Sequence, residues 1–342
     1  MIKILEVNPN TNDAMSFYRG RGPLQQLKKS YPNEIDWYPM GGGMNYNWDF
    51  LGIFDLVFLL RPFDQSHVNL MLACKQYGIP TWIDYDDLLT DVPQENPAFT
   101  TYNTPAAKKN IAEILDLATV ITFSTEHLRQ EMGKDVLEKS FTIQNAHNPK
   151  LLRNPVPFKP HKKVVWRGSK THERDLQQFE SQIRDVMRLS QHKHPGEWLI
   201  EFMGMNPIGI TDYADAIYSP YMDKNTYFRY LSEIEGSISI VPLSHRKTEL
   251  NFNKSKSNIA WLEATYAGMV SLAPNWPEWR KPGIINYIDD LDFKEKLTAM
   301  IEGKYDLESL HKLSWQYICS ELTLEKTNQQ RLSVIRLSQK PG

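Results

Sequence analysis

Residues 252–274 read FNKSKSNIAWLEATYAGMVSLAP, and this stretch predicts a helix, a turn and a strand in succession. Apolar residues recur at helical spacing from Ile259 onward. Ser255 or Ser257 is expected to cap the start of the helix, because a serine hydroxyl accepts a hydrogen bond from a free first-turn amide. Gly268 is expected to end the helix in the left-handed conformation before an apolar strand.

Two charged side chains in this stretch, Lys256 and Glu263, are seven residues apart and would share one helix face. They would lie roughly 10 Å apart, which is about the span from a diphosphate to a ribose. The lysine and the first-turn amides suit anionic oxygens, and the carboxylate could accept hydrogen bonds from both ribose hydroxyls. An amphipathic helix with a solvated lysine and glutamate explains the same spacing. The spacing alone favours neither interpretation.

The stretch resembles the pattern F-N-x-x-K-S-x-x-x-x-L-E-x-x-x-x-G of the group 1, or family 4, nucleotide-sugar glycosyltransferases. The matching residues are Phe252, Asn253, Lys256, Ser257, Leu262, Glu263 and Gly268. In that family the glutamate at the position of Glu263 holds the donor ribose. Many members carry a second glutamate eight positions earlier, near the transferred sugar, where this chain has Ser255. The resemblance therefore leaves the identity of the sugar open.

A second resemblance follows the strand predicted at Val164–Trp166. The segment RGSKTHERDL is similar to the family's second-domain opening, G-S-x-x-H-x-x-D-L, in Gly168, Ser169, His172, Asp175 and Leu176. A basic residue near that glycine contacts the donor diphosphate in the family, which here indicates Arg167 or Lys170. The resemblance covers most of residues 164–275 well and the first half of the chain more loosely. It implies an α/β protein of the GT-B type, with two Rossmann-like domains whose parallel sheets face a central cleft.

Length and composition agree with a two-domain globular chain. At 342 residues it exceeds the usual size of a single core, and 41% hydrophobic with 23% charged residues excludes a largely disordered protein. The net charge of -2 provides no global attraction to nucleic acid or membranes. Cys74 and Cys319 form no CxxC pair, which argues against a disulfide framework or a zinc site. With no run of 18 apolar residues, we expect a cytoplasmic protein without a transmembrane segment.

The domain boundary is predicted at residues 148–163, which carry four prolines and five basic residues without an apolar period. We expect residues 1–150 to form an acceptor-side domain and residues 164–315 a donor domain. Residues 316–342 are expected to form a C-terminal helix that returns to the first domain, as the resemblance implies. The sequence indicates no oligomeric state.

The first domain is expected to open with a strand at Ile2–Val7 and a loop at its carboxyl end, where open parallel sheets bind ligands. Tyr18 and Arg19 lie in this loop and are candidate acceptor-side or phosphate contacts, although a surface arginine beside a turn is the simpler interpretation. Gly41–Gly43 could form a phosphate cradle, but no closely preceding strand is predicted. We therefore expect a flexible loop near the cleft.

A run at Phe54–Leu60 that is apolar apart from Asp55 predicts a strand covered on both faces. His67 follows it at the start of a helix, and together with His172 it is a candidate catalytic base, although a structural histidine is at least as common at such positions. The next strand precedes DYDDLL, whose carboxylates begin at Asp84. We favour a helix cap and a hydrogen-bonded loop there over a metal site, because no histidine or cysteine is adjacent.

Sugar transfer builds negative charge on the departing phosphate, so the site needs cations more than a nucleophile. Arg167, Lys170 and Lys256 are the candidates. The resemblance implies a UDP-sugar as co-substrate, no metal or other cofactor, and retention of anomeric configuration. A two-Rossmann epimerase or phosphorylase, and a catalytically silent nucleotide-sugar-binding protein, remain alternatives.

The acceptor is the least determined feature. We expect a saccharide or another hydroxyl compound. The alternative is DNA carrying 5-hydroxymethylcytosine or another hydroxymethylated base, the acceptor of bacteriophage members of the family. A basic region favours DNA as the acceptor. It consists of Arg153, Lys159, Lys162, Lys163 and Arg167 and is flanked by Trp166. The net charge of -2 argues against it.

Overall fold

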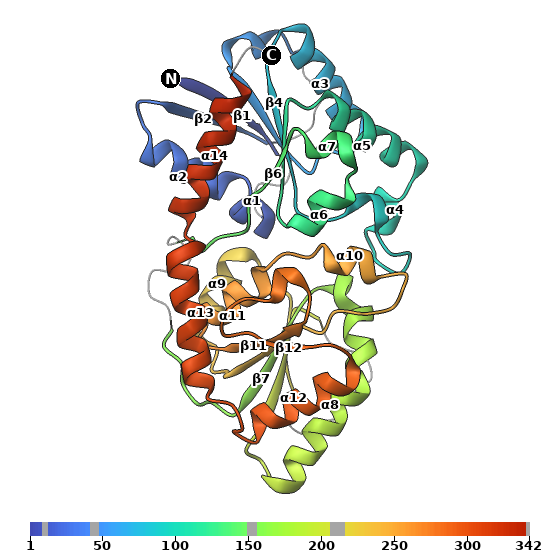
Figure 1. Cartoon of the computed structure of the whole chain (residues 1–342), viewed down its shortest axis with the longest axis vertical. Coiled ribbons are helices and arrows are strands. Elements are labelled where there is room, and N and C mark those ends of the chain that lie inside the picture. The colour runs from blue at the N-terminus through green and yellow to red at the C-terminus, as the bar shows by residue number, and fades with distance from the viewer. Residues whose placement is uncertain (9–12, 42–47, 149–155, 206–215, 340–342) are drawn as a thin grey trace.

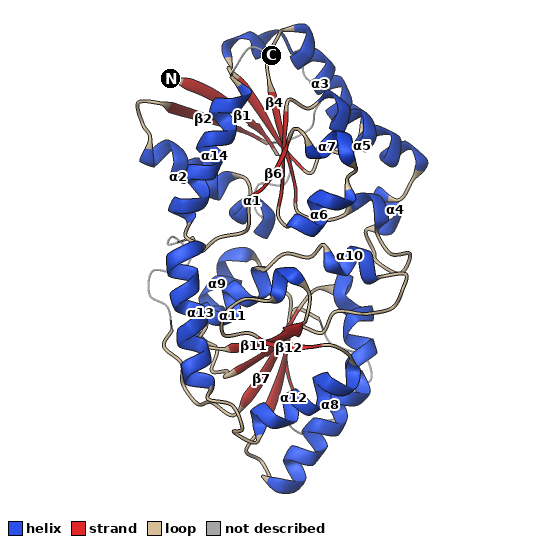
Figure 2. Ribbon diagram, viewed as in Figure 1, coloured by secondary structure: helices blue, strands red, loops and turns tan. Residues whose placement is uncertain are grey.

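The computed structural model describes residues 1–8, 13–41, 48–148, 156–205 and 216–339. They form two domains, each with a six-stranded parallel sheet between helices (Figures 1 and 2). The N-terminal sheet has the order β2 (Ile35–Met40), β1 (Ile2–Val7), β3 (Leu56–Leu60), β4 (Thr81–Tyr85), β5 (Val120–Phe123) and β6 (Ser140–Thr142). The C-terminal sheet has the order β12 (Ile285–Tyr287), β11 (Val270–Pro274), β10 (Ile238–Ile240), β7 (Lys163–Arg167), β8 (Leu199–Met203) and β9 (Ala216–Ser219).

Helices cover both faces of each sheet. Those of the N-terminal half are α1 (Ala14–Tyr18), α2 (Arg21–Ser30), α3 (Gln65–Gln76), α4 (Phe99–Tyr102), α5 (Pro105–Leu117), α6 (Glu126–Glu131) and α7 (Lys134–Leu137). The later ones are α8 (Glu173–Lys193), α9 (Lys224–Glu233), α10 (Leu250–Lys254), α11 (Ile259–Tyr266), α12 (Asp290–Ile301), α13 (Leu307–Glu321) and α14 (Leu324–Ser338). Short 3-10 turns are η1 (Trp48–Ile53), η2 (Leu89–Asp91), η3 (Lys170–His172) and η4 (Pro277–Trp279).

The central strand β3 shows why the N-terminal sheet is covered on both sides. All five of its residues are buried, and successive side chains of a strand point to opposite faces. Leu59 belongs to the core beneath α3 and α5. Phe58 belongs to the core beneath α2 and α14, where Ile335 of α14 packs with it.

The C-terminal sheet is built in the same way. Trp166 of β7 packs with the core beneath α8 and α12, whose Phe179 and Phe293 rings lie 4.8 Å apart. Its neighbour Val165 packs on the other side with Leu231 of α9 and residues of α11. The order of this sheet reverses between β7 and β10, and in open parallel sheets such a reversal opens a ligand crevice at the carboxyl ends of the strands.

The predicted elements are confirmed in the main, with differences at two strands and one helix. The expected strand at Ile2–Val7 is present with the same bounds. Strand β2 ends at Met40, so the prediction that no strand closely precedes Gly41 is wrong; Gly42 and Gly43 lie outside the described residues. Strand β9 was missed, and Tyr18 ends the short helix α1 instead of lying in a loop. Both strands are edge strands, which carry a weaker burial pattern than central ones.

Helix α11 begins later than the serine caps predict. Its N-cap is Asn258, and no side chain caps it. The Ser255 hydroxyl donates to the Asn251 carbonyl at 3.0 Å, and the Ser257 hydroxyl accepts from Asn145 at 2.9 Å. Lys256 therefore lies in the turn before the helix and shares no helix face with Glu263. The predicted end is confirmed, since Gly268 has φ of +80°.

The C-terminal region forms two helices where one amphipathic helix was expected. Figure 1 shows α13 along the C-terminal domain and α14 along the N-terminal domain. The break falls at Leu322 and Thr323, where the Thr323 side chain caps α14. The same point pairs with the chain as it leaves the first sheet, because the His147 amide donates to the Leu322 carbonyl at 2.7 Å. Among the described residues, no helix is long and apolar enough to cross a bilayer.

Candidate functional site

The candidate site lies between the two domains, where the carboxyl end of β7 meets α1 of the N-terminal domain (Figure 1). At its centre is the Glu263 carboxylate, which is 1% exposed. One oxygen accepts from the Tyr18 hydroxyl at 2.8 Å and the other from the Tyr227 hydroxyl at 2.6 Å. The Arg167 guanidinium, at the end of β7, completes the cluster at 2.8 Å from the second oxygen. Glu263 thus joins both domains.

The electrostatics of this cluster keep both phenols protonated. Burial raises the pKa of Tyr18 well above its ordinary value, and the adjacent Glu263 carboxylate raises it further. Burial does the same to the pKa of Tyr227, with Arg167 opposing the shift. The two hydroxyls are therefore donors, and the carboxylate acts as an acceptor that a ligand hydroxyl could use in their place.

A second cluster crosses between the domains at Lys256. Its ammonium lies 2.8 Å from the Asp87 carboxylate of the N-terminal domain and 4.1 Å from the Phe252 ring centroid. The other Asp87 oxygen accepts from Arg61 at 2.7 Å, and Arg61 also binds Asp86. Arg61 follows β3 directly and has φ of +49°, a strained conformation that concentrates at functional sites.

The turn before α11 is held by the N-terminal domain through polar contacts. Asn145 donates from its side chain to Ser257, and its carbonyl accepts from Asn258 at 3.3 Å. The Thr125 hydroxyl donates to the Ser255 carbonyl at 3.2 Å. Ser257, a predicted donor-binding residue, is thus at the interface of the domains, beside Lys256.

The loop after β7 contains three further predicted residues. Gly168 has a packing reason for its identity, because a Cβ there would lie 2.6 Å from the Trp166 ring. Lys170 is exposed in η3, next to the residues that face the N-terminal domain. His172 precedes α8, and its Nδ1 lies 2.9 Å from Asp175, whose other oxygen accepts from Asn253. In this arrangement His172 supports the contact between α8 and α10.

Two predicted residues lie in the interior of the N-terminal domain, and one of them, Arg19, donates to the Asn145 side chain at 3.3 Å. Arg19 is 1% exposed and forms a bidentate ion pair with Asp84, at 2.9 and 2.6 Å. His67 is 3% exposed and forms a capping box with Asp64 at the start of α3. Burial lowers the pKa of His67. The expected surface arginine is not found, and no side chain caps the short helix η2 at the end of DYDDLL. The predicted hydrogen-bonded loop is present, since Asp84, Asp86 and Asp87 all accept from arginines.

The predicted residues Tyr18, Arg167, Lys256, Ser257 and Glu263 are therefore brought together at the domain interface. Sequence reasoning missed three members of the clusters: Tyr227, Arg61 and Asp87 as the partner of Lys256. Arg61 carried a signal, since it directly follows a fully buried strand, and Asp87 belongs to the segment for which a hydrogen-bonded loop was predicted. Among the described residues, no group of three or more histidine, cysteine, aspartate or glutamate side chains is placed to hold a metal ion.

No family model matches this chain, and no curated protein matches its sequence. Solved structures do match its fold over nearly the whole length. HepE of Anabaena, in complex with UDP and glucose, has a TM-score of 0.61 at 10% identity and covers 98% of this chain and 100% of its own. A UDP-forming trehalose-phosphate synthase of Burkholderia xenovorans has a TM-score of 0.65 at 11% identity, with both chains covered completely.

An E. coli trehalose-6-phosphate synthase bound to UDP-2-fluoro glucose has a TM-score of 0.64 at 10% identity and covers 99% of each chain. At such low identity a structural likeness establishes architecture and leaves chemistry to be argued from the site. The chain therefore has the GT-B fold, with two Rossmann-like domains built on parallel six-stranded sheets.

Proposed function

We propose that this protein is a glycosyltransferase that moves a sugar from a nucleotide-sugar donor, most suitably a UDP-sugar, to an acceptor hydroxyl. One observation carries the proposal. The Glu263 carboxylate is buried at the point where the C-terminal sheet reverses its order, and hydroxyl donors from both domains converge on it. The fold likeness to UDP-sugar-dependent enzymes supports it.

The donor would bind by exchange of partners. A ribose would replace the tyrosine hydroxyls on Glu263, since diol and phenol offer the same O–H donors. The diphosphate would attract Arg167 and Lys256 away from Glu263 and Asp87, and it would meet the first-turn amides of α11, which no side chain caps. These cations would then stabilise the charge that develops on the departing phosphate.

Exchange of this kind requires the domains to separate before the donor enters. Tyr18 and Asp87 belong to the N-terminal domain, whereas Glu263 and Lys256 belong to the C-terminal one, so both contacts must break. The structure would then correspond to a closed state in which the protein's own side chains occupy the donor's bonding positions. Domain closure over bound substrate is a common step in such enzymes.

Finer features of the reaction follow from the resemblance alone. We propose retention of configuration, donor binding without a metal, and a saccharide or other hydroxyl acceptor. The basic region that favoured DNA is weaker than its sequence indicates, because Trp166 is 2% exposed and Lys162 and Lys163 pair with Glu197 and Glu201. Arg153 lies outside the described residues. DNA with hydroxymethylated bases remains the second candidate acceptor.

Calorimetric titration with UDP-glucose tests the donor site. Glu263→Ala should weaken binding by about 1–3 kcal/mol, the cost of unpaired ribose hydroxyls. Glu201→Ala is a matched control, because Glu201 is also buried, also accepts from a tyrosine hydroxyl and also pairs with a cation, but on β8 away from the cleft. Equal affinities for both variants and the wild type would move the ribose site elsewhere.

Release of UDP in the presence of an acceptor distinguishes an enzyme from a silent binding protein. The silent alternative has a structural basis at Ser255, which is 0% exposed and hydrogen-bonded within its own turn. It therefore presents no carboxylate to a sugar. Binding of UDP-glucose without UDP release, over saccharide and hydroxymethylcytosine-DNA acceptors alike, would favour the silent protein.

A further inference from the structure

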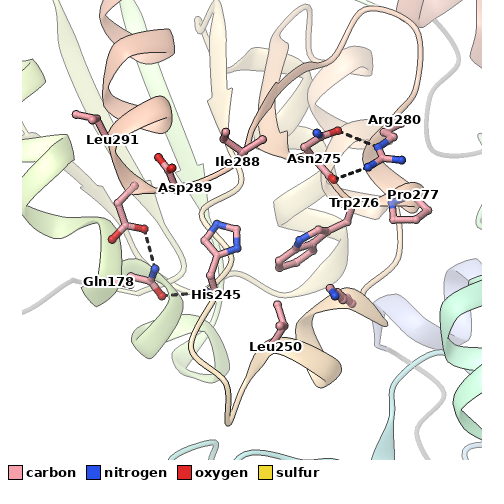
Figure 3. Close-up of a pocket in the computed structure, with 12 residues that line it drawn as sticks. Gln178, His245, Leu250, Asn275, Trp276, Pro277, Arg280, Ile288, Asp289 and Leu291 are labelled. Carbon is pink, nitrogen blue, oxygen red and sulfur yellow. Dashed lines mark hydrogen bonds between the residues drawn. The ribbon is translucent and has the colours of Figure 1, made fainter.

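A pocket of about 770 Å³ opens in the C-terminal domain outside the donor site. It lies at the carboxyl ends of β11 and β12 and is bordered by α10 and α12 (Figure 3). Trp276 and Ile288, which follow the two strands, contribute side chains to it, and Leu250 closes it from α10. Its volume falls in the range of small-molecule binding sites.

Helix α10 separates this pocket from the domain interface. Leu250 and Lys254 line the pocket, whereas Asn251 bonds to His127 of the N-terminal domain at 3.0 Å and Phe252 packs into that domain's core. None of the donor-site residues proposed above lines the pocket. A ligand here would therefore lie on the far side of α10 from the nucleotide sugar.

The pocket wall offers both hydrogen-bond donors and hydrogen-bond acceptors that the protein itself does not use. The ammonium group of Lys254 forms no hydrogen bond or ion pair within the described part of the chain. Arg280 uses its Nε and one amino group on Asn275, which leaves the other amino group free to donate. Asp289 and Asp290 each have one oxygen engaged, by the Asp292 amide and by Gln178, and each retains an acceptor.

The charges in the pocket balance. Lys254 and Arg280 face Asp289 and Asp290, and burial lowers the pKa of His245, which favours its neutral form. A wall of this composition does not select a dianion such as a diphosphate, because the carboxylates would repel it. It suits a neutral ligand with many donors and acceptors.

An apolar surface lies beside these polar groups. Figure 3 shows the rings of His245 and Trp276 together in the pocket, and their centroids are 5.3 Å apart. Ile288 and Leu291 line the pocket and are 63% and 65% exposed. Exposed apolar residues around a polar pocket are typical of a binding site.

We infer that this pocket is a second saccharide-binding site. Pyranose rings carry hydroxyls that both donate and accept, together with C–H faces that pack on apolar surface, and the pocket offers partners for both. It would hold a part of a glycan acceptor remote from the reacting hydroxyl. That role in acceptor binding rests on the proposed function, whereas the binding of saccharide does not.

Saturation-transfer NMR with short oligosaccharides of glucose, galactose, mannose and N-acetylglucosamine tests the inference. At least one series should bind the wild type, and Leu291→Trp, which adds bulk to the pocket lining, should weaken that binding about tenfold or more. Lys254→Ala should weaken it in the same direction. Leu313→Trp is the matched control, because Leu313 is 47% exposed on α13 and does not line the pocket.

Saturating UDP separates the two sites. Oligosaccharide binding that persists with UDP and is lost in the two pocket variants supports the inference. Binding to none of the four series, equal binding by all variants, or displacement by UDP would overturn it. Failure of UDP to bind would contradict the proposed function alone and leave the saccharide result standing.

Discussion

Tyr18→Phe is the sharpest test of the closed state, because one hydroxyl links the two domains through Glu263. The Tyr18 hydroxyl donates to a carboxylate that is 1% exposed. The phenylalanine ring can keep the edge contact with Phe17, whose centroid lies 5.2 Å away. The substitution therefore removes one hydrogen bond and little packing.

The magnitude follows from the charge and burial of the acceptor. A hydrogen bond to a charged group contributes about 1.5–3 kcal/mol, and its loss leaves one Glu263 oxygen without its partner in the closed state. Donor binding breaks this hydrogen bond in the wild type, whereas the variant has no such bond to break when it binds the donor. UDP-glucose should therefore bind the variant more tightly, by between about tenfold and about a hundredfold.

Calorimetric titration of UDP-glucose measures this difference, and small-angle scattering of the free protein should show a more open variant. Tyr230→Phe is the control, since Tyr230 donates to the buried Glu201 within the C-terminal domain. Its donor affinity should equal that of the wild type. Unchanged or weaker donor binding by Tyr18→Phe would refute the reasoning that the ribose replaces this hydroxyl.

Three further predictions concern the neighbouring residues. Lys256→Ala should weaken UDP-glucose binding by about 1–3 kcal/mol, because the diphosphate loses a cation. Lys256→Arg should recover part of this affinity, and calorimetry measures both variants. Gly168→Ala should lower the melting temperature, since the added methyl group would meet the Trp166 ring at 2.6 Å. Chemical denaturation should show a free energy of unfolding that is lower by about 1–3 kcal/mol. Burial raises the pKa of Glu278 from 4.5 to about 7. Between these two pH values the folded chain holds a proton that the unfolded chain releases. The free energy of unfolding should therefore fall by about 3 kcal/mol as pH rises from 4.5 to about 7. Denaturation of Glu278→Gln at both ends of this pH range should show that this part of the pH dependence is lost.

Much of the fold could be predicted because central strands carry continuous apolar runs and helices carry their own period. The run at Leu56–Leu60 needs no partner to be recognised, since a strand buried on both faces has no polar side. Edge strands such as β2 have one exposed flank and a mixed pattern, and for that reason β2 and β9 were missed.

The start of α11 shows how tertiary contacts override a local signal. The hydroxyls of Ser255 and Ser257 are sound capping groups by sequence. In the fold one is used within its own turn and the other bonds to Asn145, which is more than a hundred residues away in the chain. The helix therefore begins at Ile259, and Lys256 faces Asp87 instead of sharing a face with Glu263.

By itself the sequence determined the succession of β/α units. It placed Arg167 and Gly168 at the end of a strand and Glu263 within a helix. Only the tertiary structure decided what those side chains contact. Tyr18 and Glu263 are 245 residues apart in the chain, and no local pattern encodes their hydrogen bond. Periodicity depends on neighbours within one element, whereas the site is formed where two separately folded sheets bring their strand ends together.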